Sequence, residues 1–106
     1  MAAPLHEVRK VRVSPYTYAV YDVPGLPDSG RCHPDHESIQ LASQQADNQK
    51  RDTLLHESIH AIIAQGMSAS LKELDKMLEE TLVSFLAPRL LALMRDNPRL
   101  VEYLTS

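Results

Sequence analysis

Two histidines with helical spacing are the residues of this chain most suited to chemistry. Residues 53–62 read TLLHESIHAI, which places His56 and His60 four positions apart. On an α-helix such residues project from one face, about one turn apart. Their imidazole nitrogens can then reach one zinc ion at about 2.0–2.1 Å. Glu57 follows His56, so its carboxylate can reach a water molecule in the open coordination position and accept its proton as a general base.

The residues around this pattern fit an H-E-x-x-H site of the kind used by metal-dependent peptidases. The two positions between Glu57 and His60 are uncharged, and no proline interrupts the predicted helix. Residues 53–62 also resemble the longer zincin signature, with a threonine first and a hydrophobic residue last. The alternative is an ordinary amphipathic helix, but two histidines and a glutamate on a face lined by leucine and isoleucine would be costly to bury unpaired.

A catalytic zinc ion usually takes three protein ligands, so a third ligand is needed. The metzincin class requires Gly and His at the third and sixth positions after His60, where this chain has Ile63 and Gly66, and that class is excluded. Past the capping turn of the next predicted helix, the acidic residues available are Asp75, Glu79 and Glu80. Helical periodicity mildly favours Glu79 over Glu80 and leaves the choice open.

From about residue 8 to residue 104 the chain resembles a group of small phage and prophage zinc-peptidase-like proteins. These proteins have a short β-hairpin, a T-L-L-H-E-x-I-H-A helix and a helix that ends in L-x-x-L-L-x-L-x-R-D-N-P. The matching stretches here are residues 52–61, DTLLHESIHA, and residues 86–98, LAPRLLALMRDNP, in which three residues instead of two separate the first pair of leucines. The resemblance implies a minimal zincin of the gluzincin type.

The resemblance also implies a choice between the two glutamates. In this group the recurrent acidic residue lies three positions before the valine at position 83, which is Glu80 here. Gluzincins in general place the ligand glutamate about twenty residues past the second histidine. A small polar or acidic residue follows it four positions later, here Ser84. A small residue one turn further, here Ala87, would leave room under the metal.

The leading hypothesis is therefore a zinc metallopeptidase. His56, His60 and Glu80 would bind Zn²⁺, Glu57 would be the general base, and a peptide or protein substrate would pair with an edge strand. A second hypothesis is a non-catalytic interaction or regulatory module of phage origin, in which zinc supplies folding energy. Glu57 argues against that module, because a structural site does not need it. A third possibility is a plain helical domain with an accidental motif.

The elements that must position these residues give an α+β fold, with the strands first. Alternation over residues 8–13 and Tyr, Val and Thr enrichment over residues 17–23 predict a β-hairpin, with its turn at residues 14–16. Residues 24–34 contain Pro24-Gly25 and Gly30 and are predicted to be a loop. Residues 38–41 alternate over a short span and predict a third strand, within a region of hairpin, loop and strand that covers residues 8–42.

Helical periodicity begins near Asn48 and predicts a motif helix over residues 48–66, with Gly66 as its C-cap. Residues 70–104 should contain the C-terminal helices, which start with a capping box from Ser70 to Glu73. Pro88 should kink or split this region, and Asn97-Pro98 should open a short last helix. One apolar stripe is expected along the second helix: Leu71, Leu74, Leu78, Leu82, Phe85, Leu86 and Leu93.

Composition bounds the remaining possibilities. The chain has 106 residues and a formal charge of −3, which indicates a single domain and argues against a nucleic-acid-binding strip. Residues 1–7 are expected to be flexible. No apolar run predicts a membrane span, and nothing at the start reads as a signal peptide. One cysteine, Cys32, fits a reducing compartment, which the resemblance implies is the host cytoplasm. The segment with Cys32, His33 and His36 is predicted to be an exposed polar loop rather than a second metal site.

Overall fold

The computed structural model describes residues 8–13, 15–67 and 76–105. It confirms the α+β class, with a four-stranded mixed sheet and three α-helices. The expectation for residues 1–7, the capping box at Ser70 and two members of the apolar stripe, Leu71 and Leu74, lie outside the described residues. Among the described helices, none is both long and apolar enough to cross a lipid bilayer.

The strands lie in the order β1-β2-β4-β3. β1 (Lys10–Val13) and β2 (Tyr16–Val23) form the predicted antiparallel hairpin, with Val11 opposite Tyr18. The predicted third strand is also present as β4 (Ser38–Ala42), which runs parallel to β2 inside the sheet. β3 (Gly30–His33) pairs with β4 alone, in antiparallel orientation, and therefore forms one edge of the sheet.

The prediction that residues 24–34 form a loop was wrong at its C-terminal end. β3 occupies Gly30–His33 and is followed by a single 3₁₀ turn, η2 (Pro34–His36). A glycine, an arginine and a histidine give this segment little intrinsic strand preference. It becomes a strand because β4 lies beside it and α1 (Asp47–Ile62) packs against it, and strand formation depends strongly on such neighbours.

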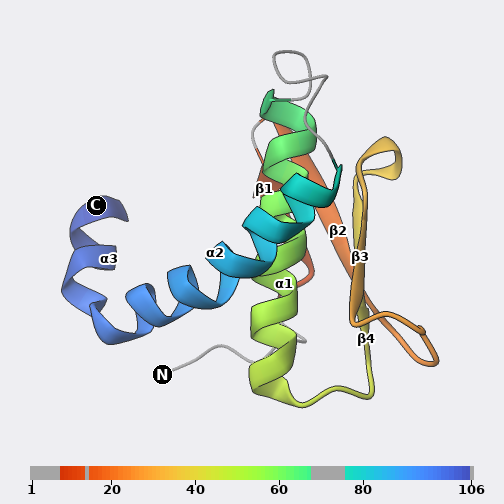
Figure 1. The fold of residues 1–106 in the computed structure, drawn as a ribbon, viewed down its shortest axis with the longest axis horizontal. Coiled ribbons are helices and arrows are strands. Elements are labelled where there is room, and N and C mark those ends of the chain that lie inside the picture. Colours follow the sequence, from red (N-terminus) through yellow and green to blue (C-terminus); the bar gives the residue numbers. More distant parts are fainter. Residues whose placement is uncertain (1–7, 14, 68–75, 106) are drawn as a thin grey trace.

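α1 packs on one face of the sheet, and the core lies between them (Figure 1). The fully buried side chains of Tyr18, Ile39 and Leu41 form this core together with Ala61 of α1. The buried residues of α1 recur every fourth position: Thr53, Glu57 and Ala61. The isoleucines and leucines whose periodicity predicted the helix thus lie beside this row of buried residues. Ile62, for example, is 52 % exposed.

The close approach of β3 to α1 depends on Gly30. A Cβ atom at this position would lie 2.6 Å from Cγ2 of Thr53, 3.2 Å from Cγ of Glu57 and 3.1 Å from the Gln40 carbonyl oxygen. The sheet edge therefore touches the helix where Glu57 is buried, and only a residue without a side chain permits that contact.

Replacing Gly30 with alanine is expected to destabilise the protein by about 1–3 kcal/mol, because the extra methyl group overpacks this contact. The free energy of unfolding in urea measures the loss. Thr53→Ser removes the nearest methyl group, so the double variant should regain part of the lost stability. Equal losses for the single and the double variant would show that Thr53 does not limit the approach of β3.

The motif helix begins at Asp47, close to the predicted start, but it does not end at a glycine cap. Its last turn widens into a π-helical turn, η3 (Ile63–Met67), so Gly66 lies inside helical backbone and the predicted C-cap was wrong. The side chain of Gln65 in this turn donates a hydrogen bond of 2.6 Å to the hydroxyl oxygen of Tyr18. This contact ties the end of the motif helix to the centre of the sheet.

α2 (Lys76–Asp96) crosses α1 and then leads α3 (Pro98–Thr105) away from the sheet (Figure 1). Pro88 does not split α2, which continues through it with the proline exposed. The small residue Ala87 and Val83 are the buried residues of α2. The predicted apolar stripe does not enter the core, since its described members are at least 40 % exposed: Leu78, Leu82, Phe85, Leu86 and Leu93. The last helix starts at Pro98 as predicted.

Candidate metal centre

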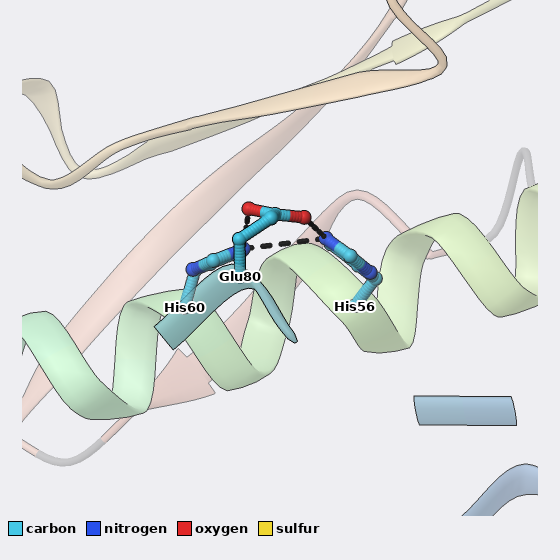
Figure 2. A group of neighbouring side chains, drawn as sticks. All are labelled: His56, His60 and Glu80. Carbon is cyan, nitrogen blue, oxygen red and sulfur yellow. Dashed lines mark hydrogen bonds and ion pairs between the residues drawn. The ribbon is translucent and has the colours of Figure 1, made fainter. Parts of the chain in front are cut away.

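Three side chains from two helices converge beside the α1–α2 crossing. His56 and His60 come from α1 and Glu80 from α2, and the glutamate spans the two rings (Figure 2). Its Oε1 lies 2.8 Å from Nε2 of His56, and its Oε2 lies 2.9 Å from Nε2 of His60. The two Nε2 atoms are 3.2 Å apart. The three residues thus direct their polar atoms at one another.

This group has the donor set and the spacing of a zinc site. Two imidazoles and one carboxylate are a ligand set of hydrolytic zinc enzymes. Bond lengths of about 2.0–2.1 Å in a tetrahedron put ligand atoms about 3.3 Å from each other. The distance of 3.2 Å between the two Nε2 atoms matches this value, and all the ligand atoms lie within 4.8 Å of one another. The carboxylate would have to retreat by a few tenths of an ångström, which its exposed side chain permits.

The crossing of the helices explains why Glu80 reaches the motif. Val83 and Ala87 are both fully buried, and they lie three and seven positions after Glu80, on the same face of α2. Packing through these two residues turns Glu80 towards α1. Ser84, four positions after Glu80, donates a hydrogen bond of 3.3 Å to Oε1 of Glu80. Ser84 thus contacts the carboxylate of Glu80, and Ala87 belongs to the buried face through which α2 packs.

The charges around Glu80 favour its ionised form. Burial by itself would raise the pKa of this carboxyl group, but attraction to His60 and His56 and hydrogen bonds from His56 and Ser84 outweigh it. The net effect lowers the pKa of Glu80. A carboxylate that is ionised and mostly exposed is ready to bind a cation.

Glu57 lies in a different environment from Glu80. It is 7 % exposed and belongs to the face of α1 that packs against β3. Burial raises its pKa, the nearby charges of Glu80 and Asp28 raise it further, and His56 and His60 partly oppose this. A carboxyl group with a raised pKa in a cleft, next to a possible metal site, has the properties of a general base that works near neutral pH.

Glu79 also reaches the motif, on the opposite side of one ring. Its Oε2 lies 2.6 Å from Nδ1 of His60, whereas Glu80 faces the Nε2 atoms. The two glutamates offered by the sequence as alternatives therefore both contact His60, at different nitrogens. Asp75, the third acidic candidate, lies outside the described residues.

The group opens into a cleft of about 530 Å³ between α1, α2 and the start of β3. Every lining residue is polar or glycine: Asp28, Ser29, Gly30, Gln49, Asp52, Thr53, His56, Glu57, His60 and Glu80. The wall formed by Asp28, Ser29 and Gly30 was missed because these residues read as a loop. Among these lining residues, Oδ1 of Asp52 is buried and has no hydrogen-bond partner in the described part of the chain.

The second group of possible ligands does not assemble. Cys32 lies against the core on β3, and burial, with Glu57 and Glu79 nearby, raises the pKa of its thiol to about 12. The rings of His33 and His36 lie 6.4 Å apart, and His33 instead contacts the side chain of Gln40. In the part of the chain that the structure describes, His56, His60 and Glu80 are the one group close enough to share a metal ion.

A comparison of the chain with protein-family models, with curated proteins and with solved structures finds no match. The residues of this cleft and their geometry are therefore the basis for a functional proposal.

Proposed function

We propose that this protein is a zinc-dependent peptidase of the gluzincin type. The observation that carries the proposal is the convergence of His56, His60 and Glu80, whose ligand atoms lie 2.8–3.2 Å apart. Glu57 supports it, because a site with a purely structural metal has no use for a buried carboxyl group beside the ligands. His56, His60 and Glu80 hold the Zn²⁺ ion, and Glu57 is the catalytic residue.

Bound zinc supplies Lewis acidity, which polarises a carbonyl group and makes a coordinated water molecule more acidic. The chain itself supplies the proton acceptor. Glu57 takes a proton from the attacking water and returns it to the amine that leaves when the peptide bond breaks. Its raised pKa suits both steps, because a group that accepts and then donates a proton works best near the ambient pH.

The sheet edge beside the cleft favours a peptide as the substrate. β3 is an edge strand with β4 on one side, and Gly30 at its start lines the cleft together with Glu57. An extended peptide can add to such an edge by main-chain hydrogen bonds, which would carry its backbone past the metal ligands. A reducing compartment such as the cytoplasm suits the proposal, since Cys32 is a free thiol.

Zinc content and peptide hydrolysis together test the proposal. We expect purified protein to hold one zinc ion per chain by elemental analysis after reconstitution. It should cleave members of a mixed peptide library followed by mass spectrometry, stop when a chelator removes the metal, and resume when zinc is restored. A protein that binds well below one zinc ion per chain after reconstitution would contradict the proposal.

One observation favours a second candidate, a zinc-stabilised interaction module. The contact between α1 and α2 buries few apolar side chains, since Val83 and Ala87 are the buried residues that α2 contributes. A metal held by ligands from both helices would strengthen this weak contact. The two candidates separate clearly, because the module predicts a large loss of stability on chelation and no cleavage of any library peptide with zinc bound.

A further inference from the structure

We propose that Glu79 is a positioning residue for His60, which keeps the Nε2 atom of that ring available as a ligand. The inference rests on the proposed function, because it concerns the same metal centre. The structure places Oε2 of Glu79 2.6 Å from Nδ1 of His60, while Nε2 of the same ring faces Glu80.

The hydrogen bond favours the tautomer of His60 that a metal ligand needs. A carboxylate can only accept a hydrogen bond, so the contact with Glu79 stabilises a proton on Nδ1. Glu80 stabilises a proton on Nε2 in the same way, until a metal ion takes the place of that proton and the neutral ring keeps only the proton on Nδ1. Outer carboxylates of this kind also hold the ring in place and make it a stronger ligand.

The position of the contact suggests that it is stronger than a surface pair. The side chains of His60 and Glu79 are 15 % and 25 % exposed, so solvent screens them only partly. Glu80 has a side chain that is 57 % exposed and is spread over both rings. The two adjacent glutamates of α2 thus have separate roles. Glu80 is a metal ligand, and Glu79 accepts a hydrogen bond from the far side of the ligand His60.

The two histidines differ in this respect. Within the described part of the chain, no carboxylate hydrogen bonds to Nδ1 of His56, and the side-chain hydrogen bonds of this ring are made by Nε2. Removing Glu79 should therefore disturb one ligand and leave the other two in place. The expected result is a weaker metal site, in contrast to the loss of the site when a ligand is removed.

Glu79→Gln and Glu79→Ala test this, with Glu102→Gln on the exposed face of α3 as the matched control. Competition with a coloured chelator should show zinc binding about 10–100-fold weaker in the Glu79 variants, more so for alanine, which cannot accept a hydrogen bond. The control should bind zinc like the wild type. Glu80→Gln should lose more affinity than either Glu79 variant, since it removes a ligand.

Nitrogen-15 NMR of the histidine rings gives a second readout that needs no metal. The background for this readout is metal-free Glu80→Ala, which removes the carboxylate that faces Nε2 of His60. At a pH where the ring is neutral, His60 should there carry its proton on Nδ1. Adding Glu79→Ala should shift the population towards Nε2, while His56 stays unchanged. Wild-type zinc affinity in both Glu79 variants, or an unchanged His60 tautomer, would overturn the inference. Failure of the wild type to bind zinc would instead overturn the proposed function, and the NMR result would still decide the role of Glu79.

Discussion

Glu57→Gln is expected to slow peptide hydrolysis about 10²–10⁴-fold while the protein keeps one zinc ion per chain. This range is the usual contribution of a general base, and glutamine has the shape of glutamate without the ability to accept a proton here. Zinc should remain because the three candidate ligands, His56, His60 and Glu80, are untouched. Cleavage rates of one library peptide at saturating zinc, with metal content measured on the same samples, check both parts.

The control for this variant is Glu102→Gln, which makes the same change on the exposed face of α3 and should leave the rate unchanged. A Glu57→Gln protein that hydrolyses peptide at the wild-type rate would remove Glu57 from the mechanism. A variant that loses zinc as well would show that Glu57 supports the metal site instead.

The same substitution should also reveal the burial of Glu57 through the stability of the metal-free protein. Burial raises the pKa of Glu57 in the folded state, so the folded protein prefers the protonated form. The stability that this preference contributes is complete below the pKa of the unfolded chain, and it is lost as the pH rises through the folded pKa. Glu57→Gln, which is neutral at every pH, should therefore match the wild type at about pH 4 and exceed its stability at about pH 8.

Urea unfolding of the two proteins at both pH values, in the presence of a chelator, measures this difference. Comparison of the pair cancels the titration of other groups, including Glu80, whose lowered pKa makes its own contribution disappear as the pH falls. Parallel stability curves for the wild type and Glu57→Gln would show that the carboxyl group is not desolvated.

His60→Ala is expected to abolish the stabilisation of the protein by zinc. A ligand at 100 times its dissociation constant stabilises a folded protein by about 2.7 kcal/mol. For a domain of this size, that raises the melting temperature by about 10–20 °C. The wild type should show this rise on addition of zinc, and His60→Ala should not, because the variant lacks one of the two histidines that are proposed to hold the ion. Thermal unfolding with and without zinc measures the difference.

His36→Ala is the matched control, because His36 is an exposed histidine in η2 and lies outside the candidate site. It should keep the full zinc response. If His60→Ala and the wild type respond equally to zinc, the ion binds elsewhere, and both the peptidase and the zinc-stabilised module lose their basis.

Sequence patterns were sufficient where the interactions are local. Four-residue spacing places His56 and His60 on one face of any helix, and the hairpin of β1 and β2 follows from alternation on both sides of a short turn. Sequence patterns failed where the conformation of a segment depends on the elements that pack against it. β3 has little strand preference of its own and exists because β4 and α1 lie against it, and Gly66 lies inside a π-helical turn.

The burial of the helices shows the same division. Leucine-rich periodicity correctly predicted that residues 76–96 are helical, yet Val83 and Ala87 are the residues that α2 buries. Small side chains allow α2 to approach α1 closely, and the larger ones are left on the outside. The periodicity of apolar residues shows which residues share a face of a helix. It does not show which face packs against another element of the fold.

The residue types and their spacing were enough to single out the candidate metal-binding pair and the candidate general base, because these three side chains share one turn of one helix. The roles of Glu79 and Glu80 could not be separated in that way. They are neighbours on α2, and either could face α1 depending on how the two helices cross. The crossing through Val83 and Ala87 directs Glu80 to the Nε2 atoms and Glu79 to Nδ1 of His60, and that arrangement depends on packing between segments far apart in the chain.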